Sequence, residues 1–287
     1  MNPLAAILPR YGLAGAEPRL LSRSENEIWA AGDLVFRIAR AGYHSRAELL
    51  SELAWLAALQ GTPGLLTLRP VPAQDGALLI ETGGRLVAAF TRIEGSHPEP
   101  GPALSPHFRQ IGRIAARLHR HAEGWTRPHG FTRKSWTIES MIGPNAIWGD
   151  WRSTTGLTAQ DRDLIGRASA EIARRIGAWD GAFGLIHGDL RLGNLLLTPT
   201  GEIAVLDFDD CGFGWQMFDF AASVSFIETA APLGDLASAW LDGYAEIAPL
   251  RASDAAMLPT MVMMRRIQLT AWLTSRAGSD TWAEYGG

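Results

Sequence analysis

Alternating apolar positions in the first third of the chain predict β-strands. Apolar side chains recur through Ile28–Ala30 and Leu34–Ala39, and the Ala-Gly-Asp between these runs has the composition of a hairpin turn. Because side chains alternate across a strand, we expect Phe36 and Ile38 on one face of the second strand and Arg37 on the opposite face. The pattern therefore predicts an antiparallel pair with one buried face.

A helix and a second hairpin are expected next. Ser45 and Glu48 have the S-x-x-E spacing of a capping box, so a helix is predicted from here to Gly61. Residues 77–81 and 86–91 then have the composition of two strands joined through a pair of glycines. These features make the first part of the chain rich in β-structure.

A boundary is predicted at residues 94–106, EGSHPEPGPALSP, where four prolines and two glycines exclude regular structure. Ser105 is expected to cap a helix with Pro106 at its first position. Further helices are predicted at about Ala159–Trp179, Met217–Phe226, Leu236–Ala245 and Ala255–Ser275. The layout is α+β, with a small β-rich N-terminal lobe (1–93), a linker (94–106) and a larger, mainly helical C-terminal lobe (107–287).

One stretch of the predicted helical part looks like a hairpin instead. Residues 195–198 and 203–206 can form two short antiparallel strands, which would bring Asn194 and Asp207 together at the open end, within reach of Asp189. Amide and carboxylate oxygens suit Mg²⁺, and a separate carboxylate can accept the proton of a hydroxyl group. These are the parts that phosphoryl transfer requires. A polar hairpin end with solvated acids would have the same spacing.

Composition and charge limit the other classes of function. The 287 residues are 47% hydrophobic and 20% charged, which is typical of a globular protein, and the net charge of −4 argues against nucleic acid as the main partner. Cys211 is the only cysteine, so no intramolecular disulfide can form. The apolar run Leu4–Leu8 ends at Pro9 and makes a poor signal peptide, so we expect a cytoplasmic protein without a membrane partner.

The stretch around Asp189 resembles the kinase-like phosphotransferases, a group that includes aminoglycoside phosphotransferases, choline kinases, homoserine kinases and the stress-response kinase A group. Their catalytic loop, H-G-D-x-x-x-x-N, matches residues 187–194, and their metal-binding D-[FLI]-[GDE] matches residues 207–209. The resemblance implies a two-lobed protein-kinase-like fold with Asp189 as the catalytic base and with Asn194 and Asp207 holding Mg²⁺. It also implies that His187 buttresses the loop and that Asp219 accepts backbone hydrogen bonds that brace it.

The resemblance extends more weakly to the N-terminal lobe, where it implies contacts with ATP or GTP. The positions concerned are Ser24, Asn26, Arg37, Glu52, Thr91 and Ile93. The family has a lysine where this chain has Arg37, and the only lysine, Lys134, lies beyond the linker. An arginine keeps the positive charge and can bind phosphate or Glu52 through two N–H groups.

The expected function is ATP- or GTP-dependent transfer of a phosphoryl group to a hydroxyl of a small molecule such as an aminoglycoside, an amino alcohol or homoserine. A cationic acceptor is conceivable because residues 215–287 contain eight acids and four arginines, although a solvated acidic face has the same composition. Two alternatives remain at this point. One is a Ser/Thr protein kinase of the stress-response kinase A type, and the other is a nucleotide-binding module without catalysis.

Two further groups of residues have open roles. Arg265 and Arg266 could bind an anionic part of the substrate, but an ion pair with a neighbouring acid is the stronger expectation because they lie in an apolar helix. His119, His121 and His129 are expected to be surface or packing residues, since helix positions two apart do not share a face and cannot easily share a metal. The roles of Asp209 and Asp210 stay open.

Overall fold

The computed structural model describes residues 3–23, 26–101, 104–229 and 232–275. Contacts within the chain divide it into two compact units, which are treated separately below. Unit 1 comprises Met1–Ser96, Trp125–Arg133 and Leu196–Asp209, whereas unit 2 comprises His97–Gly124, Lys134–Leu195 and Asp210–Gly287. The lobe boundaries expected from the sequence stay a prediction.

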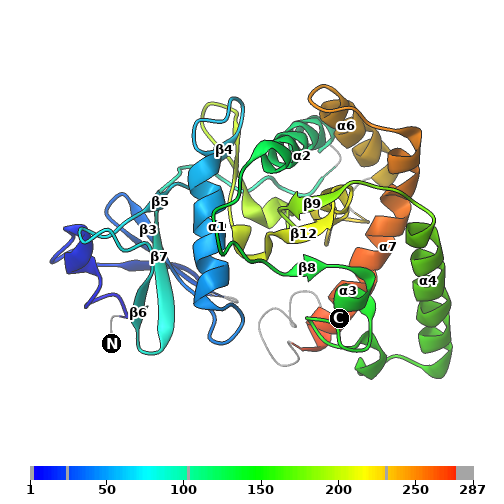
Figure 1. Ribbon diagram of the computed structural model, residues 1–287, viewed down its shortest axis with the longest axis horizontal. Coiled ribbons are helices and arrows are strands. Elements are labelled where there is room, and N and C mark those ends of the chain that lie inside the picture. The colour runs from blue at the N-terminus through cyan, green and yellow to red at the C-terminus, as the bar shows by residue number, and fades with distance from the viewer. Residues whose placement is uncertain (1–2, 24–25, 102–103, 230–231, 276–287) are drawn as a thin grey trace. The chain divides into compact units, whose positions relative to one another are not determined.

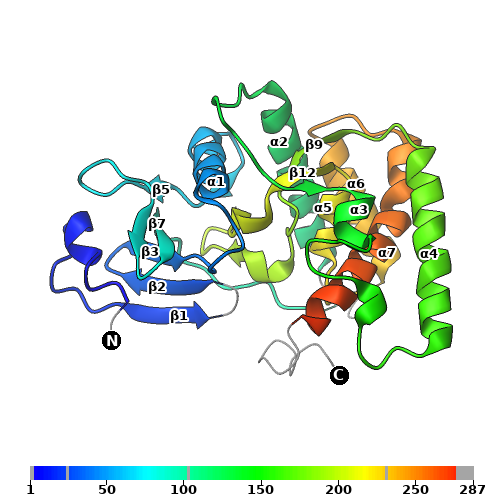
Figure 2. The ribbon, with the colours of Figure 1, turned by 60° about the horizontal axis from the view of Figure 1, so that its bottom comes forward.

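Unit 1 is built on an antiparallel sheet with the strand order β1-β2-β3-β7-β5, in which β6 also pairs with β7 (Figure 2). Its strands are β1 (Arg19–Arg23), β2 (Glu27–Ala31), β3 (Leu34–Ile38), β5 (Pro70–Val71), β6 (Ile80–Thr82) and β7 (Arg85–Thr91). The hairpins β2–β3 and β6–β7 are the two that the alternating pattern predicts. The second is shorter than expected, since its first strand begins at Ile80.

The two faces of this sheet have different roles. Phe36 and Ile38 lie in a hydrophobic cluster with the N-terminal residues Leu4, Ile7 and Leu8. Arg37 lies on the other face of β3, and its guanidinium contacts Glu52 of helix α1 (Arg46–Leu59). The predicted alternation along this strand is therefore confirmed. It leaves one charged side chain to be buried between the sheet and α1.

Helix α1 begins where the sequence predicts it. The Ser45 hydroxyl accepts a hydrogen bond from the Glu48 amide, and the Glu48 carboxylate accepts one from the Ser45 amide, which completes the capping box.

A short sheet has the order β10-β11-β4, in which β11 runs parallel to β4. Its strands are β4 (Leu66–Thr67), β10 (Leu195–Leu197) and β11 (Ile203–Val205).

Unit 2 contains a small sheet that the sequence did not predict, with the order β8-β12-β9. The strands are β8 (Ser135–Trp136), β9 (Phe183–Ile186) and β12 (Gly212–Trp215). In β12 the glycines are required by packing, because a Cβ at Gly214 would lie 2.6 Å from the Ile186 side chain and one at Gly212 would lie 2.5 Å from the Lys134 carbonyl oxygen. Two glycines in four residues disfavour a strand by composition, so the pattern gave no signal here.

The other regular elements in the described part of unit 2 are mainly helices. Helix α2 packs along α6, and α7 packs against both α4 and α5; α2 and α6 lie side by side in Figure 1, as do α4 and α7 in both ribbon views. The helices are α2 (Ser105–Gly124), α3 (Ile138–Ile142), α4 (Ala159–Gly177), α5 (Phe218–Ser223), α6 (Leu233–Ala245) and α7 (Ala252–Thr274). Across the residues that the structure describes, 3₁₀ turns lie at Leu8–Tyr11, Trp151–Ser153, Leu192–Asn194 and Phe208–Asp210.

The predicted helices of the C-terminal part are present with altered ends. Helix α2 includes Ser105 instead of beginning after it, since the Phe108 amide already bonds to the Leu104 carbonyl. Helix α5 is shorter than predicted and ends at Ser223, where the chain turns toward Phe226, a residue with a positive φ of 70°. No helix in the described part of the chain is long and apolar enough to cross a membrane.

Candidate functional site

The loop that carries Asp189 is held by a buried carboxylate beneath it. The backbone amides of His187 and Gly188 donate hydrogen bonds of 3.1 and 2.7 Å to the two carboxylate oxygens of Asp219 on α5. Gly188 has a φ of 80°, and a Cβ there would lie 2.8 Å from the carbonyl oxygen of Asp210, so a glycine is required. The predicted bracing role of Asp219 is confirmed.

His187 supports the same loop from within. Its side chain is fully buried, and its Nδ1 accepts a 3.2 Å hydrogen bond from the Asp189 amide. The neutral tautomer that accepts at Nδ1 carries its proton on Nε2. The predicted buttress is therefore present, and it fixes the backbone of Asp189 itself.

The Asp189 carboxylate is bound on both oxygens. Its Oδ1 accepts a charge-assisted hydrogen bond from Nη2 of Arg265, and its Oδ2 accepts bonds from Asn194 Nδ2 at 2.8 Å and from Arg191 Nε at 3.3 Å. Burial alone would raise the pKa of Asp189, but Arg265 and Arg191, with the Asn194 hydrogen bond, hold this pKa below its ordinary value. The group is thus ionised at neutral pH, as a proton acceptor must be.

Arg265 is itself held by neutral groups and by aromatic rings. Its Nε donates to Ser225 Oγ at 3.1 Å, its Nη1 donates to Gln268 Oε1 at 3.2 Å, and its guanidinium lies 5.1 Å from the ring centre of Trp148. The expectation of an ion pair with a neighbouring acid is confirmed for this residue. The sequence did not indicate that the acid would be Asp189, because 75 residues separate the two along the chain.

Asn194 is oriented by the same carboxylate. Its side-chain nitrogen donates 2.8 Å hydrogen bonds to both the carbonyl oxygen and the Oδ2 of Asp189. Because both bonds use the nitrogen, the amide oxygen is the atom left to bind a cation. An amide oxygen is a ligand that suits Mg²⁺, so this residue fits its predicted role in donor chemistry.

In unit 1, Arg37 and Glu52 form a buried bidentate ion pair. The Nη1 and Nη2 atoms donate to the two carboxylate oxygens at 2.7 and 2.6 Å, and neither side chain is more than 5% exposed. Burial would lower the pKa of Arg37, but Glu52 and Asp209 raise it above its ordinary value. The predicted pairing of the two residues is present. The third guanidinium nitrogen, Nε, is buried without a hydrogen-bond partner among the described residues.

Two aspartates of unit 1 lie beside this arginine. Asp207 Oδ1 is 3.7 Å and Asp209 Oδ1 is 3.6 Å from Arg37 Nη1. The Asp207 side chain is 42% exposed and its backbone has a φ of 49°, a conformation that aspartate and asparagine tolerate better than most residues. A partly exposed carboxylate on a constrained backbone is a suitable donor for a divalent cation, so Asp207 also fits its predicted role.

Asp209, whose role the sequence left open, is buried within unit 1. Its Oδ2 accepts a 3.2 Å hydrogen bond from Asn26, and its Oδ1 lies 3.3 Å from His44 Nε2. Burial would raise the pKa of Asp209, but Arg37, His44 and Asn26 lower it overall. Within this unit the carboxylate joins β3 to the segment after β11, which is a structural role.

The other predicted nucleotide contacts are placed as follows. Asn26 is buried, and its Oδ1 accepts a 3.0 Å hydrogen bond from the Arg40 amide, so both ends of this side chain hold neighbouring segments. Thr91 is the last residue of β7, and Ile93 follows two positions later; both are half-buried. Ser24 lies outside the described residues. Contacts of these four residues with a nucleotide stay a prediction.

His119 contributes to the site in a way that the sequence did not reveal. It is buried, as a packing residue is, but its Nε2 also lies 2.9 Å from Asp219 Oδ2 and its Nδ1 lies 3.0 Å from the Tyr244 hydroxyl. Hydrogen bonds from this ring and from the loop amides keep the pKa of Asp219 low, against burial, which would raise it. A histidine among the apolar positions of α2 was the only available signal.

Comparison with known proteins identifies the family. Residues 19–250 match the phosphotransferase enzyme family. The chain is 31% identical to an uncharacterized protein of Deinococcus radiodurans over 96% of this chain and 81% of the relative, and 21% identical to the amicoumacin kinase of Bacillus subtilis over 98% and 87%. The solved structure of a microcompartment-associated aminopropanol kinase superposes with a TM-score of 0.88 at 38% identity, over 98% of this chain and 91% of that one.

Both the sequence match and the fold support the same assignment. The family match covers the residues of the loop around Asp189 and of the Arg37–Glu52 pair, and the matched proteins that have a named activity are kinases. The α+β fold with a β-rich N-terminal part and a helical C-terminal part is the one expected from the resemblance. This chain belongs to the phosphotransferase enzyme family and is a kinase.

Proposed function

We propose that this enzyme transfers the γ-phosphoryl group of ATP or GTP to a hydroxyl group of a small amino alcohol. The observation that supports this most strongly is the state of Asp189, an ionised carboxylate oriented by Asn194 and Arg265. A carboxylate in this state can accept a hydrogen bond from the acceptor hydroxyl and take its proton as the new O–P bond forms. The proton goes to Asp189, and the leaving group is the nucleoside diphosphate.

The proposed metal ligands are Asn194 and Asp207. The amide oxygen of Asn194 is not used in its bonds to Asp189, and the carboxylate of Asp207 is partly exposed on a constrained backbone. Along the chain, Asn194 directly precedes β10 and Asp207 follows β11 by two residues, and these strands are neighbours in one sheet. When bound, Mg²⁺ would neutralise charge on the phosphate oxygens and lower the barrier to transfer.

The proposed phosphate contact in unit 1 is Arg37. Its two terminal nitrogens bind Glu52, and its Nε is a buried donor that still lacks a partner among the described residues. A phosphate oxygen, or a water between the two, would satisfy this donor and remove the cost of leaving it buried alone. In this proposal an arginine does the work that the lysine does in the wider family, and Ser24, Asn26, Thr91 and Ile93 complete the nucleotide contacts.

We prefer an amino alcohol to the other acceptor classes because the chain is similar to an aminopropanol kinase in sequence as well as in fold. The aminopropanol kinase is 38% identical over nearly the whole chain, whereas the amicoumacin kinase is 21% identical. A small acceptor with an ammonium group also agrees with the excess of acids in residues 215–287. Aminoglycosides and homoserine are the alternatives that a screen must include.

The test of the chemistry is the Asp189→Asn variant. An amide of the same shape cannot accept the proton, so turnover with ATP, Mg²⁺ and 1-amino-2-propanol should fall by at least about a hundredfold, while nucleotide binding measured by calorimetry should persist. Asp235→Asn, on α6, is the matched control and should leave turnover unchanged. Full activity of Asp189→Asn would refute the proposed base.

A substrate screen distinguishes the alternatives. Amino alcohols, aminoglycosides, homoserine and a casein-type protein would each be incubated with labelled ATP, and phosphorylated products would be separated by mass. Transfer to protein alone would establish a Ser/Thr protein kinase in place of a small-molecule kinase. Nucleotide binding without transfer to any acceptor would indicate the non-catalytic module.

A further inference from the structure

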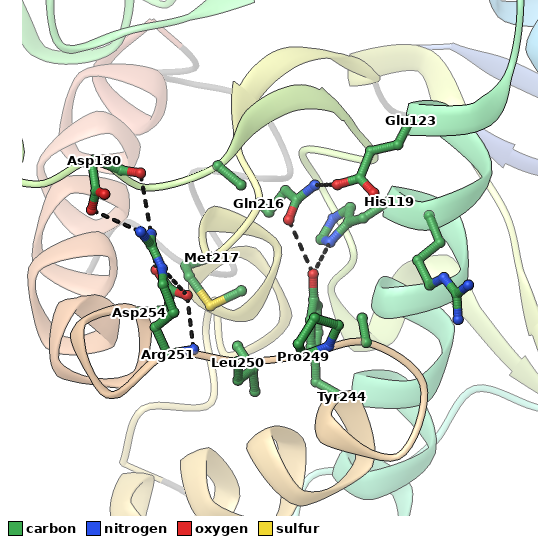
Figure 3. A pocket seen from close by; sticks show the side chains of 13 residues that line it. His119, Glu123, Asp180, Gln216, Met217, Tyr244, Pro249, Leu250, Arg251 and Asp254 are labelled. Atoms are coloured by element: carbon green, nitrogen blue, oxygen red, sulfur yellow. Dashed lines mark hydrogen bonds and ion pairs between the residues drawn. The ribbon is translucent and has the colours of Figure 1, made fainter.

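A cavity lies in unit 2, away from the contacts of Asp189. It has a volume of about 530 Å³ and is lined by residues of α2, of the segment before β9, of the segment after β12, and of the region from the end of α6 to the start of α7 (Figure 3). None of the four side chains that bond to Asp189 or its amide lines this cavity. Cavities of this size accept small organic molecules. We call it the distal cavity.

One wall of the distal cavity is a chain of hydrogen bonds that reaches the catalytic loop. Gln216 Nε2 donates to Glu123 at 2.8 Å, the Tyr244 hydroxyl donates to Gln216 Oε1 at 3.2 Å, and His119 Nδ1 lies 3.0 Å from that hydroxyl. Figure 3 shows these side chains in sequence along one side of the cavity. His119 then contacts Asp219, which holds the loop amides. The cavity and the loop thus share one network.

Donor and acceptor roles along this chain are determined by its two ends. Gln216 uses its nitrogen on Glu123, so its oxygen can only accept, and the Tyr244 proton is used there. The Tyr244 oxygen must therefore accept from His119 Nδ1, while the Asp219 carboxylate can only accept from Nε2. The two ring nitrogens of His119 thus contact the two neighbouring members of the chain, Tyr244 and Asp219. A change at Glu123 would therefore pass through Gln216, Tyr244 and His119 to Asp219.

The charges around the distal cavity favour a cation. Three carboxylates (Glu123, Asp180 and Asp254) and two guanidinium groups (Arg120 and Arg251) line it, so the carboxylates are in excess. On the side opposite Glu123, Arg251 is bound by Asp180 at 2.8 Å and by Asp254 at 2.7 Å. Glu123 receives only the neutral Gln216 amide and has no ion pair with any cation among the described residues. Burial and the carboxylates of Glu123, Asp219 and Asp254 raise the pKa of the Tyr244 hydroxyl, which agrees with a negative environment.

The floor of the distal cavity is apolar. Met217 is buried, and Leu250 and Pro249 lie beside it between the Arg251 cluster and the chain that begins at Glu123 (Figure 3). A ligand would therefore place an apolar body on these side chains and a positive group at Glu123. A primary ammonium group can donate to the carboxylate and form the ion pair that Glu123 lacks.

We propose that the distal cavity is a binding site for a small organic ammonium ion and that its occupancy is coupled to the catalytic loop through Gln216, Tyr244, His119 and Asp219. The ammonium group binds Glu123, and the ion pair orders the chain that ends at the His187 and Gly188 amides. The effect on catalysis rests on the proposed role of Asp189, whereas binding and loop ordering do not. Because the coupling is reciprocal, a change that orders the catalytic loop must raise the affinity for the ammonium ion by the same factor by which the ion favours the ordered loop.

The first test is calorimetric titration of the protein with benzylammonium, without nucleotide or acceptor. Binding is expected for benzylammonium and not for benzyl alcohol or benzoate, which have the same apolar body with no charge or the opposite charge. Glu123→Gln keeps an acceptor for Gln216 but loses the negative charge, so affinity should fall by roughly tenfold or more. Glu171→Gln, on α4, is the control. Equal binding of benzyl alcohol, or unchanged affinity of Glu123→Gln, would overturn the site.

The second test is amide hydrogen exchange of the catalytic loop. Saturation with benzylammonium is expected to slow exchange of the His187 and Gly188 amides, which donate to Asp219, and Tyr244→Phe should abolish this effect while binding is retained. Binding without any change in these amides would overturn the coupling. Because neither measurement involves phosphoryl transfer, their outcome is independent of whether the proposed kinase reaction is correct.

Discussion

The residues that carry the proposed chemistry are controlled by arginines from distant parts of the chain. Asp189 is ionised because Arg265 binds one of its oxygens, and Glu52 is tolerated in the interior because Arg37 binds both of its oxygens. Only one of the 26 basic residues is a lysine. The planar guanidinium suits both positions, since it can bond to several fixed partners at once.

Arg265→Gln tests the control of Asp189. Loss of this cation should raise the pKa of Asp189, so the acidic limb of the kcat/KM profile should move to higher pH by about one unit or more. Because the base acts when it is ionised, activity is lost at low pH and largely recovers at higher pH. Arg266→Gln, at the exposed neighbouring position, should leave the profile unchanged. A profile that keeps its acidic limb in Arg265→Gln would contradict this role.

Arg37 variants test the buried pair. Arg37→Ala leaves the buried Glu52 without its partner, which should lower the free energy of unfolding by about 3–5 kcal/mol. Arg37→Lys keeps one charge but cannot bind both carboxylate oxygens with the same fork, so a smaller loss is expected. Arg19→Ala, at an exposed position of β1, serves as the control. The measurement is urea unfolding, and equal stability of all three variants would show that the pair is not stabilising.

At the scale of elements, the contact of α2 with α6 depends on glycines that bring the backbones together. A Cβ at Gly243 of α6 would lie 1.9 Å from the carbonyl oxygen of Arg109, and one at Gly112 of α2 would lie 2.0 Å from that of Trp240. Both helices also carry residues of the network around Asp219. The approach of the two helices therefore sets the position of His119 and Tyr244.

Gly243→Ala tests this packing. The added methyl group forces α2 and α6 apart, so the free energy of unfolding should fall by about 1–3 kcal/mol or more. Gly234→Ala lies in the same helix with no atom within 4 Å of the added Cβ, and there the substitution should be neutral or stabilising by up to about 1 kcal/mol. Chemical denaturation of both variants gives the comparison. Equal stability of the two variants would contradict the packing argument.

At the scale of the whole molecule, the proposed nucleotide binding should be visible in the stability of the folded chain. A nucleotide that binds the folded chain and not the unfolded one should stabilise the folded chain by mass action. At a ligand concentration of 100 times Kd this amounts to about 2.7 kcal/mol.

Thermal unfolding with a non-hydrolysable ATP analogue measures this linkage. Mg²⁺ should increase the stabilisation by the nucleotide, and removal of the metal with EDTA should reverse the increase. Asp207→Asn should lose the metal-dependent part, and asparagine keeps the tolerance for a positive φ that the backbone requires. Glu202→Gln, in the turn between β10 and β11, should retain it. A metal effect that survives in Asp207→Asn would place the ion elsewhere.

The sequence by itself determined the parts of this protein that depend on local pattern. The β2–β3 hairpin and the capped start of α1 follow from alternation and from the Ser45–Glu48 spacing, and the spacing of Asp189, Asn194 and Asp207 indicated the chemistry. Strand β1 was missed because all five of its residues are exposed, which leaves no alternation to detect.

Only the tertiary structure decided which distant groups meet. Arg265 and Asp189 are 76 positions apart, and His119 and Asp219 are 100 apart, so no local pattern could pair them. The strand β12 exists because its glycines fit against Ile186 and Lys134, although its composition disfavours a strand. Such contacts depend on how elements pack, and packing free energy is a property of the folded chain that no short window of sequence contains.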